Sequence, residues 1–202
     1  MEFYFAPNTV ALASLITLEE TGAPYQARRL DFSQSEQQSA DYRRVNPKGR
    51  VPALVTSRGT LTETPAILTW LGQSYPDAGL LPSDRFAFAK LQEVMAYLCS
   101  TVHVSHAHKR RGWRWSDDPA VVAALSVKVT QNMADHFAYL EARFDGPYVM
   151  GAQFTVADPY LFVIAGWLEG DGVDIAGFPG IAAHFADMAK RPSVQRALAI
   201  QS

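Results

Sequence analysis

The organisation of this chain can be worked out from the stretch Asn46-Pro47-Lys48-Gly49-Arg50-Val51-Pro52-Ala53-Leu54. Pro52 stands directly before an apolar strand pattern, and a residue without an N–H group is tolerated there only at the start or edge of a strand. A trans Pro52 would do no more than begin that strand. A cis Pro52 would turn the main chain of Val51 outward, so that its N–H and C=O groups can pair with a peptide-like ligand.

A second informative stretch follows, Thr62-Glu63-Thr64-Pro65-Ala66-Ile67. Thr64 is suited to cap a helix that begins at Pro65. The free N–H groups and the dipole at such a helix start favour a carboxylate, and Glu63 can hold an ammonium group. Together the two features suit the zwitterionic end of an amino acid. A plain capped helix with a solvated Glu63 is the alternative.

The residues around these stretches alternate between strand and helix patterns. Short apolar or aromatic runs predict strands, and apolar residues three or four apart predict helices. Residues 1–76 therefore have the predicted order β-α-β-α-β-β-α, with strands at 3–5, 25–30, 53–56 and 60–62 and helices at 8–22, 41–45 and from 64 on.

Beyond this α/β unit the strand patterns stop. Residues 77–84 have the composition of a linker. Thr155 and Asp158 form a capping-box pattern, which serves the start of a helix and to which we assign no chemistry. The division predicted is an α/β domain at 1–76 and an all-α domain at 85–202, with helices at 88–98, 120–144, 155–168, 181–190 and 194–200.

The composition narrows the classes of protein. With 202 residues, 48% of them hydrophobic, and a net charge of -2, the chain can bury a core and has no basic excess for nucleic acid. The single cysteine, Cys99, excludes a disulfide within the chain and is expected in the core. No apolar run approaches the roughly 18 residues of a membrane span, and the N-terminus has no secretory pattern. These features predict a cytoplasmic protein without membrane or nucleic-acid partners.

The two stretches, in this order on a β-α-β-α-β-β-α unit followed by helices, resemble the glutathione transferase family. Phe5-Ala6-Pro7, Leu18-Glu19-Glu20 and Leu61-Thr62-Glu63-Thr64-Pro65-Ala66-Ile67-Leu68 look most like the bacterial beta-like members. The resemblance covers essentially the whole chain. It implies a thioredoxin-like N-terminal domain, an all-α C-terminal domain that forms the second-substrate pocket, and a homodimer.

The resemblance also implies how glutathione would bind as a substrate. Pro52 would be cis, and the main chain of Val51 would pair with the cysteinyl part of the tripeptide. Glu63 and Thr64 would hold its γ-glutamyl end, and Lys48 would lie near the tripeptide. A small electrophile is the second substrate that the family implies.

The sequence departs from the family at the group that stabilises the thiolate. Members use a Tyr, Ser or Cys near the end of the first strand or the start of the first helix, but Phe5, Val10 and Ala11 stand at three of these positions. Thr9 matches the serine of some insect-type members, and Asn8 is a second possible donor to the sulfur. If Thr9 is the donor, Thr9→Ala lowers turnover by about tenfold or more. The alternative is that either residue only caps the helix.

Three histidines lie close together at His103, His106 and His108. Their spacing matches no known zinc motif, and no metal is expected. His103 falls where beta-class members carry a histidine that faces the active site, so it is a candidate for orienting water or stabilising charge near the thiolate. A partly buried helix histidine is the alternative.

The stretch Lys109-Arg110-Arg111-Gly112-Trp113-Arg114-Trp115 allows three interpretations. A solvated loop between two long helices is the default, and binding of nucleic acid by stacking and phosphate contacts is the least supported. In the third, His106, Arg111 and Trp113 border the second-substrate pocket, where arginine favours anionic electrophiles and tryptophan favours flat apolar ones. Of the two functional interpretations we prefer this one.

These observations predict a glutathione transferase that conjugates or reduces small electrophiles with the glutathione thiolate. Two alternatives stay open because the usual catalytic side chain is missing. One is a non-catalytic glutathione-binding protein of the same fold. The other is a glutathione-dependent disulfide reductase, in which bound glutathione supplies all the sulfur chemistry.

Overall fold

The first strand shows how the N-terminal sequence builds a layer on each side of a sheet. In the computed structural model, which describes residues 1–201, strand β1 (Glu2–Phe5) alternates its side chains between two faces. Phe3 and Phe5 are buried in the main core, whereas Tyr4 lies against Tyr42 with 5.5 Å between the ring centroids. The period of two along the strand therefore gives both faces an apolar covering.

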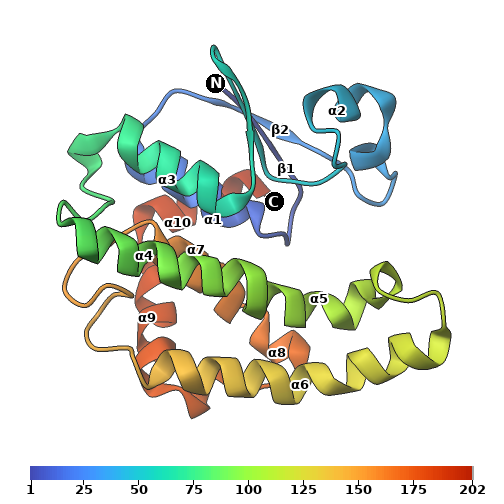
Figure 1. Cartoon of the computed structure of the whole chain (residues 1–202). Coiled ribbons are helices and arrows are strands. Elements are labelled where there is room, and N and C mark those ends of the chain that lie inside the picture. Colours follow the sequence, from blue (N-terminus) through green and yellow to red (C-terminus); the bar gives the residue numbers. More distant parts are fainter. Residues whose placement is uncertain (202) are drawn as a thin grey trace.

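Strand β1 lies inside a four-stranded sheet of order β2-β1-β3-β4. Strand β2 (Gln26–Arg29) is parallel to β1, and β3 (Ala53–Thr56) is antiparallel to both β1 and β4 (Gly59–Thr62). Helices α1 (Ala11–Thr21) and α3 (Thr64–Ser74) pack together toward the main core, and α2 (Ala40–Val45) covers the face of Tyr4 (Figure 1). The predicted thioredoxin-like order is confirmed.

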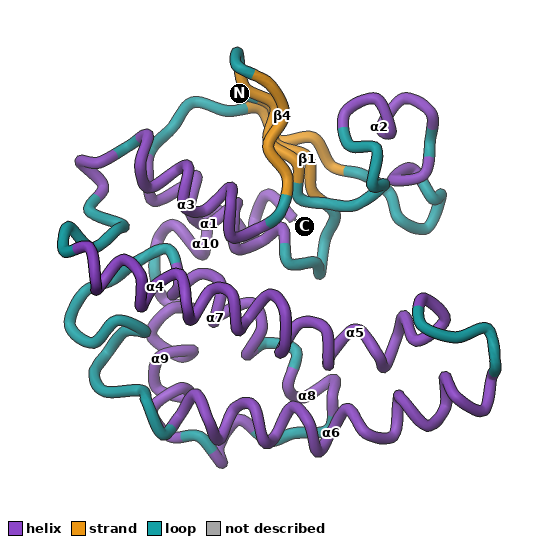
Figure 2. The backbone as a smooth tube through the Cα atoms, in the orientation of Figure 1, coloured by secondary structure: helices purple, strands orange, loops and turns teal. Residues whose placement is uncertain are grey.

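From Arg85 on, every named element is helical, as predicted, and Figure 2 shows the strands confined to one end of the molecule. Helices α4 and α5 follow one another through a π-helical turn without a break in the helical backbone. The elements are α4 (Arg85–Tyr97), the π turn η3 (Leu98–Val102), α5 (His103–Arg111), the 3-10 turn η4 (Gly112–Arg114), α6 (Pro119–Glu141), α7 (Ala157–Ala165), α8 (Leu168–Asp171), the 3-10 turn η5 (Ile175–Gly177), α9 (Pro179–Lys190) and α10 (Pro192–Gln201).

The structure corrects two of the expected elements. The helix expected at 155–168 is divided, because α7 ends at Ala165 and α8 begins at Leu168. The stretch 109–115 is not wholly a loop, because α5 packs against α6 and continues to Arg111 before the turn η4. Gly112 lets the chain pack closely on α6 here, since a Cβ atom there would lie 3.0 Å from the side chain of Val122.

One hydrophobic core runs through both parts of the chain. Every residue of α7 is buried, and α7 packs against α1. Helix α10 also packs against α1, so the end of the chain returns to the N-terminal part (Figure 1). Ion pairs of Glu20 with Arg191 at 2.9 Å and of Glu19 with Arg196 at 2.6 Å join the two parts at the surface. The division into domains at 1–76 and 85–202, with a linker at 77–84, stays a prediction.

The capping box predicted at Thr155 and Asp158 is present and buried. Oδ2 of Asp158 accepts from the N–H of Thr155 at 2.7 Å. Its Oδ1 accepts from the N–H of Val149 at 2.8 Å and lies 3.0 Å from Nε2 of His184 on α9. One carboxylate therefore fixes the start of α7 against the loop before it and the helix after it.

Replacing Asp158 by alanine is expected to lower the free energy of unfolding by about 3 kcal/mol or more, because several buried donors lose their acceptor. Urea denaturation measures this change. Asp84→Ala is the matched control, because Asp84 caps the exposed start of α4 through the N–H of Ala87 at 2.8 Å. Loss of such a cap costs about 1 kcal/mol. Equal losses in the two variants would contradict the central role of Asp158.

Candidate active site

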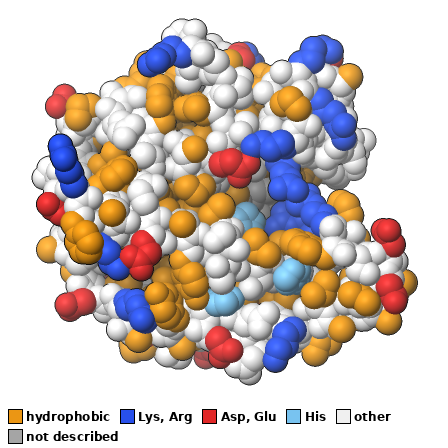
Figure 3. Space-filling view, in the orientation of Figure 1, with side chains coloured by type: hydrophobic (Ala, Val, Ile, Leu, Met, Phe, Trp, Pro, Cys, Tyr) orange, Lys and Arg blue, Asp and Glu red, His pale blue; other side chains and the backbone are white. Residues whose placement is uncertain are grey.

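A cavity of about 750 Å³ lies between the sheet-containing part and the helical part of the chain. Figure 3 shows a hollow on this face, with Lys and Arg side chains gathered at its wall and histidine beside them. Of the candidate residues, only Lys48 does not line the cavity. The candidates that do line it are Asn8, Thr9, Val51, Pro52, Glu63, Thr64, His103, His106, Arg111 and Trp113.

The Val51–Pro52 peptide bond is cis, as the family resemblance implied. Strand β3 begins only at Ala53, so the main chain of Val51 lies outside the sheet. Within residues 1–201, neither the N–H nor the C=O group of Val51 has a hydrogen-bond partner. Two unpaired main-chain groups at a cavity wall form an edge to which a short extended peptide can bind.

The start of α3 differs in one respect from the prediction. Thr64 is the first residue of the helix, and Glu63 takes the cap position without a side-chain cap bond. Glu63 has a φ of 72°, which is uncommon for a residue with a Cβ atom. Lys48 forms an ion pair with Glu63 and donates to Oγ1 of Thr62 at 2.7 Å. The first N–H groups of α3 have no partner within the helix and face a place where a carboxylate is favoured.

The start of α1 offers two donors in different states. The hydroxyl of Thr9 donates to the carbonyl of Ala6 at 2.7 Å and accepts from the N–H of Ala11 at 3.3 Å, so its proton is already engaged. Asn8 is exposed, and its main-chain N–H donates to Oε1 of Gln201 at 3.4 Å. The side-chain amide of Asn8 has no partner in the described part of the chain. Asn8 is therefore the freer of the two donors.

His103 lies on the helical wall of the cavity and is neutral. Burial, and after it the charge of Arg111, lower the pKa of His103 to about 3. Nη2 of Arg111 lies 3.2 Å from Nε2 of His103, and the neutral ring can accept this hydrogen bond. His103 therefore does not stabilise a thiolate as a cation. Its contact instead positions the guanidinium group of Arg111.

His106, one turn further along α5, is held by a buried carboxylate. Its Nδ1 lies 2.7 Å from Oδ2 of Asp171, and its ring stacks on Trp167 with 4.3 Å between centroids. Asp171 is 1% exposed and ends α8. A carboxylate at Nδ1 fixes the ring and leaves Nε2, which has no partner within residues 1–201, for a ligand in the cavity.

Some cavity residues escaped the sequence analysis. Arg50 lines the cavity next to Val51, and the stretch quoted first contains it, so this signal was available. Trp167 also lines the cavity, and Asp171 supports it through His106. Nothing in the sequence places α8 beside α5, so these two residues carried no signal.

The expectation that Cys99 belongs to the core is corrected in part. Cys99 packs against the main core, but it is only half-buried and lines the cavity near Tyr160. Burial raises the pKa of both the Cys99 thiol and the Tyr160 hydroxyl. A thiol with a raised pKa stays protonated at neutral pH and is a weak nucleophile.

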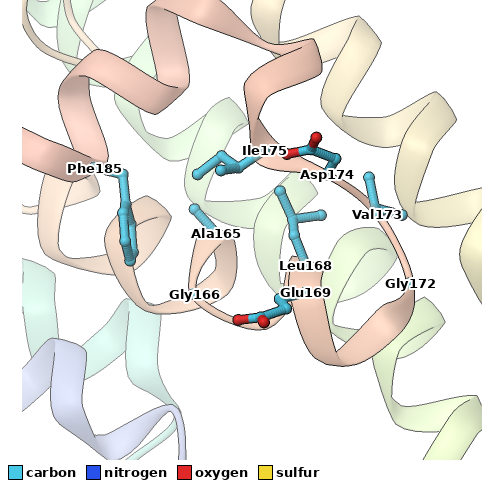
Figure 4. Close-up of a pocket in the computed structure, with 9 residues that line it drawn as sticks. All are labelled: Ala165, Gly166, Leu168, Glu169, Gly172, Val173, Asp174, Ile175 and Phe185. Atoms are coloured by element: carbon cyan, nitrogen blue, oxygen red, sulfur yellow. The ribbon is translucent and has the colours of Figure 1, made fainter.

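The rest of residues 1–201 shows no second candidate functional site. Residues 1–201 contain no group of three or more His, Cys, Asp or Glu side chains that could hold a metal ion. None of their helices has the length and apolar character needed to cross a membrane. A smaller cavity of about 470 Å³ lies between α7, α8 and α9 (Figure 4), and none of the candidate residues lines it.

Comparison with known proteins accounts for this arrangement. Residues 1–73 match the model of the glutathione S-transferase N-terminal domain, and residues 101–187 match a model of the C-terminal domain. The chain belongs to the glutathione S-transferase family.

Members of known structure and name cover nearly the whole chain. A glutathione transferase homologue from Sulfitobacter, with bound glutathione, is 43% identical with a TM-score of 0.96, over 98% of this chain and 97% of that one. A sphingomonad glutathione S-transferase complexed with glutathione is 32% identical with a TM-score of 0.87, over 100% and 98%. Glutathione S-transferase GstA of Escherichia coli O157:H7 is 33% identical over 100% of this chain and 98% of its own length.

As a glutathione S-transferase, the chain lacks two of the side chains that the family uses on the sulfur. Phe5 and Val10, at the positions where the resemblance places Tyr and Cys, are buried in the main core. Neither side chain has a group that can donate a hydrogen bond. The thiolate must therefore be stabilised by other groups around the cavity.

The depressed pKa of His103 makes the stability of this transferase depend on pH. In the unfolded chain the ring binds a proton near pH 6.5, whereas in the folded chain its pKa is about 3. The free energy of unfolding therefore falls as the pH drops through this window, and this histidine contributes about 2 kcal/mol to the loss between pH 7 and pH 5. His103→Gln, which keeps an acceptor for Arg111, is expected to remove that contribution in urea denaturation at the two pH values. An unchanged difference would show that His103 is protonated in the folded protein.

Proposed function

We propose that this glutathione S-transferase binds glutathione between Val51 and the start of α3 and transfers its thiolate to a small electrophile. The unpaired main-chain groups of Val51 and the N-terminus of α3 open on one cavity, and this observation carries the proposal. Val51, after the cis Pro52, would pair with the cysteinyl part of the tripeptide. Glu63 would bind the γ-glutamyl ammonium and Thr64 the carboxylate beside it. Two of the related structures contain glutathione, which supports this ligand.

Lys48 has an indirect part in this proposal. It does not line the cavity, but its ion pair with Glu63 and its bond to Thr62 hold the Glu63 carboxylate at the cavity edge. Both partners are partly exposed to solvent, so the pair contributes little to stability. Its role is to orient a carboxylate whose second oxygen meets the ligand.

The thiolate needs stabilisation from groups that carry a donor or a positive charge. Lowering a thiol pKa by two units corresponds to about 2.7 kcal/mol in favour of the thiolate. The free amide of Asn8, the hydroxyl of Thr9 and the N-terminus of α1 line the same cavity as Val51. The electrophile would enter on the opposite side, against His106, Arg111 and Trp113.

A homodimer and a cytoplasmic location complete the proposal. The homodimer rests on membership of the glutathione S-transferase family, and Phe86 at the start of α4, 73% exposed, is one apolar side chain that a partner subunit would cover. The single cysteine, which pairs with no other, fits a reducing compartment.

Glu63→Gln is expected to raise the Kd of glutathione about tenfold, because a hydrogen bond between charged groups contributes about 1.5 kcal/mol or more. Isothermal titration calorimetry measures this change. Glu93→Gln is the matched control, because Glu93 is paired with Lys90 on the surface of α4 as Glu63 is paired with Lys48. If the unaltered protein gives no heat with millimolar glutathione, the proposed function fails. If Glu63→Gln binds like the unaltered protein, Glu63 is not part of the site.

Asn8→Gly is expected to lower kcat about tenfold with a chloronitrobenzene as electrophile, and to leave the Kd of glutathione unchanged. Glycine is chosen because φ at Asn8 is 57°, a conformation that glycine adopts without strain. Thr9→Ala separates the two donors in the same assay. A full rate in Asn8→Gly with a loss in Thr9→Ala would show that the Thr9 hydroxyl leaves Ala6 and donates to the sulfur.

A further inference from the structure

Arginines gather at the cavity wall from two distant parts of the chain, and three of the four that line it interact with one another. Arg50 precedes the Val51 edge, Arg111 ends α5, and Arg114 lies in η4. Their charges are close enough to act on one another. The pKa of Arg111 is lowered by burial and then by Arg114 and Arg50, and the pKa of Arg114 is lowered by burial and then by Arg50.

None of these three guanidinium groups forms an ion pair with a carboxylate of residues 1–201. Four other arginines differ, since Arg28, Arg44, Arg191 and Arg196 each pair with an acidic side chain. The carboxylate at the cavity edge, Glu63, is already held by Lys48. Like charges gathered at a cavity wall without a counterion favour an anion in the cavity, most of all beside Arg111, which is the partly buried one of the three.

The neighbours of these arginines indicate where that anion would lie. His103 is neutral and accepts from Arg111, so it orients the guanidinium group without adding a fourth charge. Trp113 is 63% exposed, lies under Arg114 with 5.3 Å from Cζ to the ring centroid, and lines the cavity. Trp115 and Phe32 also line it and are 48% and 41% exposed. The arginines therefore stand beside exposed aromatic faces, which suit a flat apolar body.

We propose that Arg50, Arg111 and Arg114 form a subsite for a carboxylate on the second substrate, so that the enzyme acts on aromatic or conjugated electrophiles that carry a carboxylate. Guanidinium groups bind carboxylates through two parallel hydrogen bonds, which is the reason for this choice of anion. The substrate class rests on the proposed function, because the reacting partner is the glutathione thiolate. With a chlorodinitrobenzoate, the sulfur would form a bond to the ring carbon and chloride would leave with the bonding electrons. The arginines bind the carboxylate and do not touch the reacting carbon.

Glutathione itself carries carboxylates, and its glycine end is the other anion that these arginines could hold. The positions of the residues favour the second substrate. Two of the three, Arg111 and Arg114, belong to the helical wall with His103 and Trp113, and only Arg50 adjoins the groups proposed for glutathione at 51–64. The experiment therefore has to measure both ligands.

The test compares an unreactive dinitrobenzoate with its neutral methyl ester by calorimetry, with S-methylglutathione present at saturation. The carboxylate is expected to bind about tenfold more tightly than the ester to the unaltered protein. Arg111→Gln and Arg114→Gln are expected to remove this preference and to change the affinity for the ester less than about twofold. Arg58→Gln in the β3–β4 turn is the control and is expected to keep the preference. Two variants are used because Arg111 is the more buried of the two.

The outcomes separate this proposal from the proposed function. Equal affinities for carboxylate and ester in the unaltered protein would overturn it. A raised Kd of S-methylglutathione in both arginine variants, with the benzoate preference intact, would also overturn it and assign the cluster to glutathione. If the benzoate binds through the arginines but the protein does not bind glutathione, the anion subsite is upheld and the proposed transferase function is refuted. Turnover of the chlorinated benzoate and its ester, each divided by its uncatalysed rate, should show the same preference in kcat/KM.

Discussion

The carboxylate of Asp158 fixes the helix against which the rest of the molecule packs. Helix α7 is buried along its whole length, and Asp158 joins its start to Thr155, Val149 and His184. Helix α1 packs directly on α7, so the position of α1 follows from this arrangement. The cavity depends on the position of α7 in two ways. Tyr160 of α7 lines the cavity, and the residues just before α1, which packs on α7, form part of the cavity wall.

The two walls of the cavity have different chemical characters. The wall from the N-terminal part presents main-chain groups at Val51 and at the start of α3, a kind of edge that suits an extended peptide with little dependence on side chains. The wall from the helical part presents cations, rings and a histidine held by Asp171. This division explains why the cis Pro52 and the start of α3 followed from short sequence patterns, whereas the contact of His106 with Asp171 on the other wall did not.

The features that could be predicted from the sequence depend on residues that are close together along the chain. The strand and helix order, the place of Pro52, and the bonds of Thr155 with Asp158 each depend on residues only a few positions apart. The pair of His106 and Asp171 joins residues 65 positions apart, and the arginine cluster joins Arg50 to η4. The first grouping requires the contact of α5 with α8, and the second requires η4 to lie on the same cavity as Arg50. No pattern in the sequence encodes either. The state of Thr9 also escaped prediction, because a hydroxyl before a helix can donate to a carbonyl three residues back as well as to a ligand.

The neutral state of His103 connects the two walls. A protonated ring beside Arg111 would add a charge to a cluster in which Arg111 and Arg114 already have lowered pKa values. Burial and this repulsion keep the ring neutral, so the cluster holds its arginines charged and oriented. Their uncompensated positive field reaches across the cavity and favours a thiolate as well as a carboxylate, because both are anions. Under the proposed function, a cavity without the usual Tyr or Cys would ionise a bound thiol by combining a neutral donor, Asn8 or Thr9, with the charges of the arginine cluster.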